Sequence, residues 1–474
     1  MRKKVLSVLL CTAMATTLLT GCGGSSDDSS SKGSDAGSKA GSEVTSEKKS
    51  TAEVSTGGKV LNIRCWNEEF KTRVEDHYPG YEKTGKKSGK IGDVTVKWNI
   101  TPNEDNAYQN ALDEALLAQK DAKTDDKIDM FLVEADYALK YVDTEYTVDV
   151  VNDLGVSEES LANQYQYTKD IVTDSNGALK GASWQGCPGG MIYRRDIAKK
   201  VFGTDDPAKI QEKFSDWDAF KTAAAELKDK GYQITASVND TYRVYSNNVS
   251  SKWVEDGKIN MDENIKRWVD DSKEMVENGY TATHDLWSSD WSAGFMESGN
   301  VFCYFGPAWF IDFSMNSKDD DGNWVKGSVG AAHNWAVTEG PQGFFWGGTW
   351  LCGANGTDNA DLVKDIIEKL TCDEEIMTEI ATKDSDFVNN QSAIESLSTS
   401  KKFKNEILGG QNPIPVFANG MGSIDMSNIT SYDQTCTEEI QTAMKDYFDG
   451  NASYDDALAT FYKNVETKHP ELSH

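Results

Sequence analysis

Strand and helix patterns alternate near the start of the folded region, and their order restricts the possible folds more than any other feature. Residues 59–65 and 94–100 alternate apolar and polar side chains, as strands do. Residues 128–133 form a short apolar run, which is typical of a strand buried on both faces. Between these last two, residues 108–116 carry apolar side chains at helical spacing. A strand, a helix and a strand in this order predict a right-handed parallel crossover and therefore an α/β fold.

Further helical patterns follow along the chain. Ser215 opens a sequence that resembles a capping box, with Asp218 in place of Glu, and Asp358 and Ser453 are further N-cap candidates. The folded part is longer than one hydrophobic core usually accommodates, so we expect two α/β lobes. The helices expected from these patterns have apolar positions within 220–227, 363–370, 440–448 and 457–465.

The first residues carry the features of a secretory signal. Arg2, Lys3 and Lys4 precede an apolar stretch that is too short to span a bilayer comfortably, so we expect residues 1–21 to be a signal peptide. Leu19-Thr-Gly-Cys22 matches the bacterial lipobox, in which the cysteine thiol is diacylated and becomes the new N-terminus. The alternative is an ordinary cysteine beside a signal-peptidase cut. We expect acylation of Cys22, because several acyl chains anchor a protein stably to a membrane.

Residues 22–58 consist of that cysteine and a tract of Ser, Gly, Lys, Glu and Thr with almost nothing apolar. Such a tract cannot bury enough surface to offset the entropy lost on ordering. We therefore expect a disordered tether, which would hold the folded region at the extracytoplasmic face of the bacterial cell membrane.

The charge balance excludes some classes of partner. The 474 residues include 77 Asp and Glu against 48 Lys and Arg, a formal net charge of −29. A field of this sign repels nucleic acid and anionic lipid head groups, whereas neutral sugars are indifferent to it. The hydrophobic share of 38% is ordinary for a soluble globular protein. We expect no nucleic-acid partner, no cofactor and a monomeric protein.

The cysteines that follow the tether contain no Cys-x-x-Cys pair and no metal-ligand spacing. Six cysteines could form three bridges in an oxidising compartment. Most of them lie in apolar or aromatic sequence, where free cysteine behaves as a small hydrophobic residue. Free thiols are therefore favoured over disulfides. The six are Cys65, Cys187, Cys303, Cys352, Cys372 and Cys436.

Recognisable catalytic signatures are missing from the sequence. The five histidines are isolated, and there is neither an H-E-x-x-H motif nor a G-x-S-x-G elbow. The segment 85–90 is one residue short of a phosphate-binding loop and lacks its Ser or Thr, and 319–322 lacks the ligand spacing of a calcium loop. A carboxylate pair for glycoside hydrolysis stays possible, since 77 acids always supply some pair at a suitable distance.

Aromatic residues beside hydrogen-bonding residues, at positions where strands should end, are the positive signal. Ligands of open α/β sheets bind outside the carboxyl ends of the strands. An indole can stack on the C–H face of a sugar, while carboxylates and amides bond its hydroxyls. We expect at least two indoles of this set to stack on sugar rings, and we assign Trp98, Trp217 and Trp268 to packing. The candidate binding residues are Trp66, Asn67, Glu68, Glu134, Asp136, Trp184, Gln185, Asp240, Tyr242, Arg243, Trp287, Trp291, Trp309, Trp350 and Asp433.

Several segments in a fixed order resemble the family 1 extracellular solute-binding proteins of ABC importers. Residues 188–203, with Gly-Gly-Met-Ile-Tyr-Arg-Arg-Asp at their centre, are similar to the family's Tyr-Tyr-Asn-Lys-Asp-Leu-Phe segment, and Ser-Asp-Trp at 215–217 follows where the family has Pro-x-Thr-Trp. Residues 298–304 and 346–370 resemble two later family segments. Arg194-Arg195 replaces the usual Asn-Lys, which indicates a distinct subfamily. The likeness spans essentially the whole mature chain.

The resemblance implies a two-lobed periplasmic-binding-protein-like fold, with a hinge and a ligand cleft between the lobes. By motif order, residues 59–185 and 346–398 would form the N-lobe, and 186–345 and 399–474 the C-lobe. It also implies a carbohydrate ligand, most often an oligosaccharide, and delivery to ABC permease subunits in the membrane without catalysis. A lipid-anchored glycosidase and a passive glycan-binding module are the alternatives. Neither the sugar nor its linkage is encoded in any spacing of the sequence.

Overall fold

The computed structural model describes residues 52–315, 317–319 and 322–474. The expected signal peptide 1–21, Cys22 and most of the expected tether lie outside the described residues. Within the described part, every helix is too short or too polar to cross a membrane.

Seven strands form the larger sheet, in the order β2-β3-β4-β1-β5-β12-β6. The strands are β1 (Val60–Cys65), β2 (Tyr81–Gly85), β3 (Ser88–Ile91), β4 (Val94–Ile100), β5 (Met130–Glu134), β6 (Ala182–Ser183) and β12 (Thr349–Gly353). Strand β1 pairs in parallel with β4 on one side and with β5 on the other, so that Ile63 lies opposite both Trp98 and Met130. The parallel arrangement predicted from the sequence is confirmed. Strand β12 pairs antiparallel with β5 and β6.

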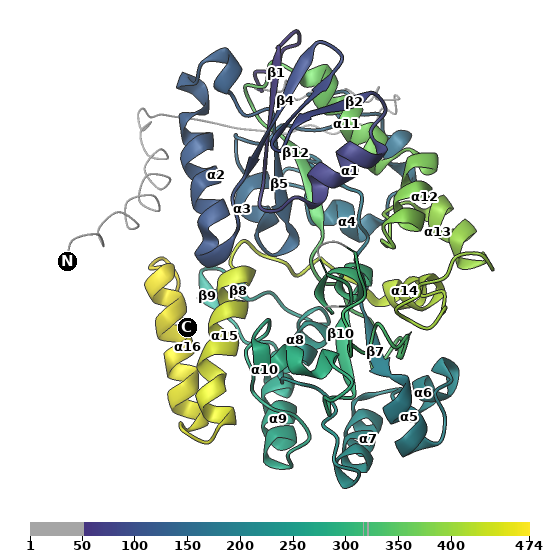
Figure 1. The fold of residues 1–474 in the computed structure, drawn as a ribbon. Coiled ribbons are helices and arrows are strands. Elements are labelled where there is room, and N and C mark those ends of the chain that lie inside the picture. The colour runs from purple at the N-terminus through teal and green to yellow at the C-terminus, as the bar shows by residue number, and fades with distance from the viewer. Residues whose placement is uncertain (1–51, 316, 320–321) are drawn as a thin grey trace, which may run out of the picture. The chain divides into compact units, whose positions relative to one another are not determined.

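Helices cover both faces of this sheet (Figure 1). Alternate side chains of β5 enter different cores: Met130 and Leu132 pack with α1, α11 and α12, and Phe131 and Val133 pack with α2 and α3. The prediction that this strand is buried on both faces is confirmed. The helices on this side of the molecule are α1 (Glu69–His77), α2 (Ala107–Ala118), α3 (Ala138–Val142), α4 (Gln166–Asp170), α11 (Ala360–Thr371), α12 (Glu374–Lys383) and α13 (Gln391–Ser398).

A second core packs on one face of a three-stranded sheet in the order β10-β7-β11, made of β10 (Cys303–Gly306), β7 (Gly190–Arg194) and β11 (Trp335–Thr338). Trp217 and Trp268 are buried in it, as their assignment to packing predicts. A small hairpin joins β8 (Val254–Glu255) and β9 (Lys258–Ile259). The helices here are α5 (Arg195–Phe202), α6 (Pro207–Lys213), α7 (Trp217–Asp229), α8 (Asn239–Ser246), α9 (Glu263–Glu277), α10 (Ser289–Ser292), α14 (Ile414–Gly420), α15 (Asp433–Phe448) and α16 (Tyr454–Lys468).

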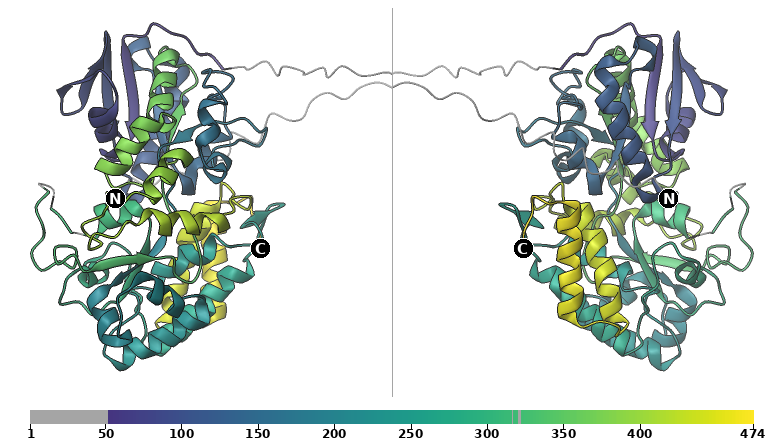
Figure 2. Two further views of the ribbon diagram at one scale, coloured as in Figure 1. Left: turned by 90° about the vertical axis from the view of Figure 1, so that its right-hand side faces the viewer. Right: turned by 90° about the vertical axis from the view of Figure 1, so that its left-hand side faces the viewer.

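The chain passes between the two sheets after β6, returns between β11 and β12, and leaves the larger sheet again after α13. Two of these connections and the segment before α13 are hydrogen-bonded to each other. The amide of Gly189 donates to Phe344 at 2.8 Å, and the amide of Gly186 donates to Phe387 at 2.8 Å. The last two helices, α15 and α16, lie side by side in the half of the molecule that contains the smaller sheet (Figure 2). The boundaries predicted for the lobes stay a prediction.

The end of the expected tether differs from the sequence prediction. Residues 53–58 are hydrogen-bonded to the segment 355–360, through Ser55 to Thr357 at 3.0 Å and Gly58 to Asp358 at 2.8 Å. Val54 also packs against the core of the larger sheet. Backbone pairing of this kind needs no apolar side chain, so the polar composition of the segment does not reveal that it is ordered. The boundary of the expected tether at residue 58 is therefore corrected to a position before residue 53.

The structure revises two of the three expected helix N-caps. Helix α7 is capped by Asp216, not Ser215, because the Asp216 Oδ1 accepts from the amide of Ala219 at 2.8 Å. Asn359, not Asp358, precedes α11, and its side-chain amide donates to the backbone of β1 instead of capping the helix. Ser453 caps α16 as predicted. Adjacent capping residues are chemically equivalent, so local sequence does not decide between them.

The six cysteines in the described part of the chain are unpaired, which confirms the preference for free thiols. Five are buried and Cys372 is half-buried. Burial raises the pKa of the Cys65 thiol to about 12 and that of Cys372 to about 11. Such thiols are inert at neutral pH, because the thiolate is the reactive form.

Replacing the α7 cap, Asp216→Ala, should lower the free energy of unfolding by about 1 kcal/mol, because one amide at the helix start loses its acceptor. Ser215→Ala is the matched control and should change the free energy of unfolding by much less, since Ser215 is exposed and does not cap the helix. Urea unfolding followed by circular dichroism measures both. A larger loss for Ser215→Ala than for Asp216→Ala would contradict this assignment of the cap.

Candidate functional site

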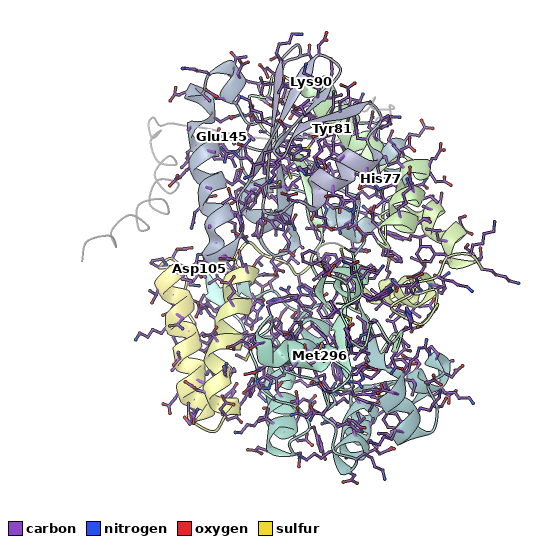
Figure 3. All side chains as sticks on the ribbon, in the orientation of Figure 1. His77, Tyr81, Lys90, Asp105, Glu145 and Met296 are labelled. Atoms are coloured by element: carbon purple, nitrogen blue, oxygen red, sulfur yellow. The ribbon has the colours of Figure 1, made fainter. Side chains whose placement is uncertain are left out.

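A cavity of about 770 Å³ lies at the carboxyl ends of β1 and β5 and is closed on its other side by α8 and α15. Trp66 and Asn67 reach it directly after β1, and Glu134 stands at the end of β5. The start of α2 and the start of α15 meet at its edge, where Gln109 and Gln434 are hydrogen-bonded at 3.2 Å. Figure 3 labels Asp105 at this junction. The cavity is of the size that small-molecule sites usually have.

The structure brings most of the sequence-predicted binding residues together around this cavity. They belong to both halves of the molecule, one around the larger sheet and one around the smaller sheet. The sequence alone could only suggest this. Their contact with a ligand stays a prediction. The predicted residues that line the cavity are Trp66, Asn67, Glu134, Asp136, Gln185, Tyr242, Arg243, Trp287 and Trp309.

Indole rings form one wall of the cavity. The ring of Trp346 lies 5.4 Å from that of Trp309 and 5.8 Å from that of Trp287, measured between centroids. Trp66 also lines the cavity, in edge contact with Tyr137 at 6.3 Å. The side chain of Trp287 is 53% exposed, and its φ of +70° lies in the left-handed region. A bulky residue rarely adopts such a backbone, and backbone strain of this kind concentrates at functional sites.

A bidentate ion pair crosses the cavity. Arg243 on α8 donates through Nη1 to the Oδ1 of Asp136 at 2.6 Å and through Nη2 to its Oδ2. Asp136 belongs to the turn that follows β5, so the pair joins the two halves of the molecule. The guanidinium also lies over the ring of Trp346, 5.9 Å from its centroid. Planar, bidentate pairing of this kind fixes orientation as well as adding energy.

Glu134 is a carboxyl group that holds its proton at neutral pH. Burial and, after it, the negative charge of Asp136 together raise its pKa to about 8, although Arg243 opposes the shift. Its Oε2 accepts from the amide of Asp136 at 2.9 Å. A protonated carboxyl can donate as well as accept a hydrogen bond. Glu134 can therefore bond either kind of atom on a ligand hydroxyl.

Glu69 and Gln185 form the floor on the side of α1. The Nε2 of Gln185 donates to the Oε1 of Glu69 at 3.0 Å and to the Oδ2 of Asp386 at 3.1 Å. Burial, and after it the charge of Asp386, raises the pKa of Glu69 to about 7, while Arg73 lowers it. The bonds to two carboxylates hold the Gln185 amide in one orientation.

Two predicted indoles belong to the core and not to the cavity, and their prediction is corrected. Trp184 is 0% exposed, stacks on Phe70 and donates to Asp386 at 3.2 Å. Trp350 is also 0% exposed and donates to the carbonyl of Thr168 at 2.8 Å. Both side chains lie within or beside strands whose two faces are covered, so no face of either ring is open to a ligand.

Trp291 and Asp240 are corrected together, because they satisfy each other. The Nε1 of Trp291 donates to the Oδ1 of Asp240 at 2.7 Å, and both side chains are buried. Asp240 also accepts from the amide of Ser237 at 2.8 Å. Burial raises the pKa of Asp240 to about 7. The pair ties α10 to the start of α8 behind the cavity wall.

Glu68 and Asp433 do not line the cavity either. Glu68 precedes α1 with its side chain in solvent, near Lys71 at 3.4 Å. Asp433 turns back on its own loop, where it accepts from the amide and the hydroxyl of Thr430. Burial raises the pKa of Asp433 to about 7. The side chain of each acid points away from the cavity, and the local sequence does not show in which direction a side chain points.

Other lining residues escaped the sequence analysis. Trp346 is the partner of Trp350 in one Trp-Gly-Gly-Thr-Trp segment, and Glu69 follows the predicted Glu68. Both residues lie in segments from which the sequence analysis took a candidate. The segments were therefore identified correctly, but the wrong side chain was chosen from each. Tyr137, Asn239 and Gln434 carried no signal of their own, because they lie on helices or turns whose facing is set by packing.

A family comparison identifies the chain. The model of the family described as bacterial extracellular solute-binding protein matches residues 83–407. The chain belongs to this family. It is therefore a solute-binding protein of the extracytoplasmic side and not an enzyme, as the sequence predicted.

Solved structures of binding proteins share the fold. One, described as an extracellular solute-binding protein of family 1, has 16% identity and a TM-score of 0.67, covering 86% of this chain and 99% of that one. The GacH receptor of Streptomyces glaucescens, solved unliganded and with acarbose, has 16% identity and a TM-score of 0.63, covering 89% and 100%. A binding protein of B. animalis subsp. lactis with β-1,6-galactobiose has 18% identity and a TM-score of 0.62, covering 88% and 99%.

These likenesses confirm the two-lobed α/β fold that the resemblance implied. No protein of curated function matches the sequence.

Glu134→Gln should raise the thermal midpoint of this solute-binding protein more at pH 9 than at pH 5. The folded state holds the Glu134 proton up to about pH 8, whereas an unfolded chain releases it near pH 4.3, roughly. The free energy of unfolding of the wild type therefore falls as pH rises between these values. Glutamine has no proton to lose, and at pH 5 it resembles the protonated acid. Differential scanning fluorimetry across this range measures the difference.

Glu68→Gln is the control for this measurement, because Glu68 is exposed and outside the cavity. Its effect on the thermal midpoint should be the same at both pH values. A stabilisation by Glu134→Gln that is equal at pH 5 and pH 9 would contradict the raised pKa of Glu134.

Proposed function

We propose that this solute-binding protein captures an oligosaccharide in the cavity and delivers it to an ABC permease in the membrane. The observation that carries the proposal is that four indoles, those of Trp66, Trp287, Trp309 and Trp346, line one cavity together with carboxyl and amide groups. Sugar rings have C–H faces that pack on indoles and hydroxyls that need directed partners. The cavity offers both kinds of contact within one space.

The solved relatives of the same fold support a carbohydrate ligand. Their descriptions name β-1,6-galactobiose, acarbose and lacto-N-biose as bound molecules. Those ligands belong to the other proteins, whose identity with this chain is 18% or less. They differ in composition and linkage, so they favour the class of ligand and not one sugar.

Delivery to a permease requires that the ligand change the protein's shape. The cavity has walls from both halves of the molecule, so a ligand that contacts both stabilises the closed arrangement over an open one. The Arg243–Asp136 pair already joins the two halves across the cavity. A ligand adds further bonds between the same halves, and the closed form is what a permease would recognise. We place the hinge in the hydrogen-bonded connections near Gly186 and Gly189.

We also propose that a lipid anchor at Cys22 holds the protein at the outer face of the membrane. The support is the Leu-Thr-Gly-Cys sequence after a short apolar stretch, followed by a polar tract. Residues 53–58 join that tract to the larger sheet through backbone hydrogen bonds. The anchor would thus be attached on the side of the larger sheet.

Single substitutions Trp66→Ala and Trp287→Ala should each weaken oligosaccharide binding tenfold or more, since a stacked indole contributes on the order of 1.4 kcal/mol or more. Trp324→Ala is the control, because Trp324 is half-buried but lies outside the cavity. Calorimetry with a panel of α- and β-linked oligosaccharides measures affinity, and circular dichroism checks folding. Folded cavity variants that bind every sugar like wild type would refute the proposed site.

Cys22→Ala should abolish metabolic labelling with palmitate and release the protein from the membrane fraction. The thiol is the only acceptor in the proposed acylation, so a serine at the same place should behave like alanine. Labelling that persists in the Cys22→Ala variant would rule out this anchor.

A further inference from the structure

Four buried polar side-chain atoms that line the cavity have no hydrogen-bond partner within the described chain: the Oδ1 of Asn103, the Oη of Tyr137, the Oδ1 of Asn239 and the Oγ of Ser314. The side chain of Tyr137 is 95% buried, being only 5% exposed. A buried polar group without a partner is costly. All four atoms can accept a hydrogen bond, so a ligand rich in donors would satisfy them.

Acids outnumber cations among the residues that line the cavity. The lining acids are Glu69, Glu104, Glu134, Asp136 and Glu438, and the lining residues include no lysine or histidine. Arg243 is the cation among them, and both of its Nη atoms are already bonded to Asp136. Glu69 lies 3.9 Å from Arg73, and Glu438 lies 3.8 Å from Lys468. Glu104 and Glu134 are therefore the lining acids without an ion-pair partner in the described part of the chain, and either could pair with a positive group on a ligand.

Burial and like charge both oppose ionisation of two of the lining acids. Burial and the charge of Asp136 raise the pKa of Glu134 to about 8. Burial also raises the pKa of Glu438, with a smaller contribution from the charge of Asp136, whereas Lys468 and the hydrogen bond from Gln434 oppose the shift. A neutral ligand would displace water and leave this repulsion in place, whereas a positive group would relieve it.

The indoles of the cavity can hold a cation as well as a sugar face. A positive group within about 6 Å of an indole centroid is attracted by the ring's electrons. The cavity already shows such a contact, since the guanidinium of Arg243 lies 5.9 Å from the centroid of Trp346. The exposed ring of Trp287 is 5.8 Å from the same ring and offers a further face.

We propose that the cavity selects an oligosaccharide bearing a free amino group over the neutral sugar of the same size and linkage. The ammonium group, which has three N–H donors and no acceptor, would bond Glu134 and the unpartnered oxygen of Tyr137. The neutral rings of the same ligand would stack on the indoles. This inference rests on the proposed carbohydrate function and names the chemical class of its ligand.

The test uses three tetrasaccharides with one β-1,4-linked glucose backbone: the glucosamine tetramer, its N-acetylated form and cellotetraose. Calorimetry at pH 5.5, where most of the amines are protonated, should give a dissociation constant at least tenfold lower for the free amine than for either neutral sugar. Repeating the titration in two buffers of different ionisation enthalpy should show proton release, because a bound ammonium lowers the pKa of Glu134.

Glu134→Gln should remove most of the preference for the free amine and the proton release. The control Glu68→Gln, an exposed acid next to the cavity, should keep both. Equal or tighter binding of the neutral tetrasaccharides, or no binding of the glucosamine tetramer, would overturn the inference. Neutral oligosaccharides that bind without any amine preference would leave the proposed function intact, whereas a protein that binds no oligosaccharide of the wider panel would refute that function.

Discussion

The burial of β5 on both faces is the constraint on which the arrangement of the site depends. Met130 and Leu132 face one core and Phe131 and Val133 face the other, so the strand must lie in the middle of the larger sheet. The chain can turn polar only where the strand leaves these two cores. The turn after Glu134 is that place, and its acids become the cavity's charged rim because apolar packing ends there.

The half of the molecule that contains the smaller sheet contributes a single cation to the lining of the cavity. Arg243 reaches Asp136 from α8, while Trp346 lies beneath the guanidinium. A protein with a buried carboxylate that has no partner would be far less stable. The ion pair therefore offsets the cost of burying Asp136 where the two halves meet. It does not cancel the shift at Glu134, whose pKa is raised first by burial and then by the charge of Asp136.

Buried indoles show why aromatic content alone is a weak guide to a binding site. Trp184 and Trp350 end in the core with their Nε1 atoms bonded to Asp386 and Thr168, and Trp291 is bonded to Asp240. Trp66 and Trp287 keep part of their rings free. An indole at a strand end either packs inward or faces the cavity, and a difference of one residue in a strand reverses its direction.

The sequence by itself determined the α/β class, the parallel orientation of β4 and β5, and the segments in which the cavity residues occur. These follow from periodicity and from where apolar runs stop, which are local properties of the chain. Tertiary structure decided which member of each cluster faces the cavity: Trp346 over Trp350, and Glu69 over Glu68. It also decided that Arg243 meets Asp136, because a contact between residues far apart in sequence depends on how two packed halves face each other.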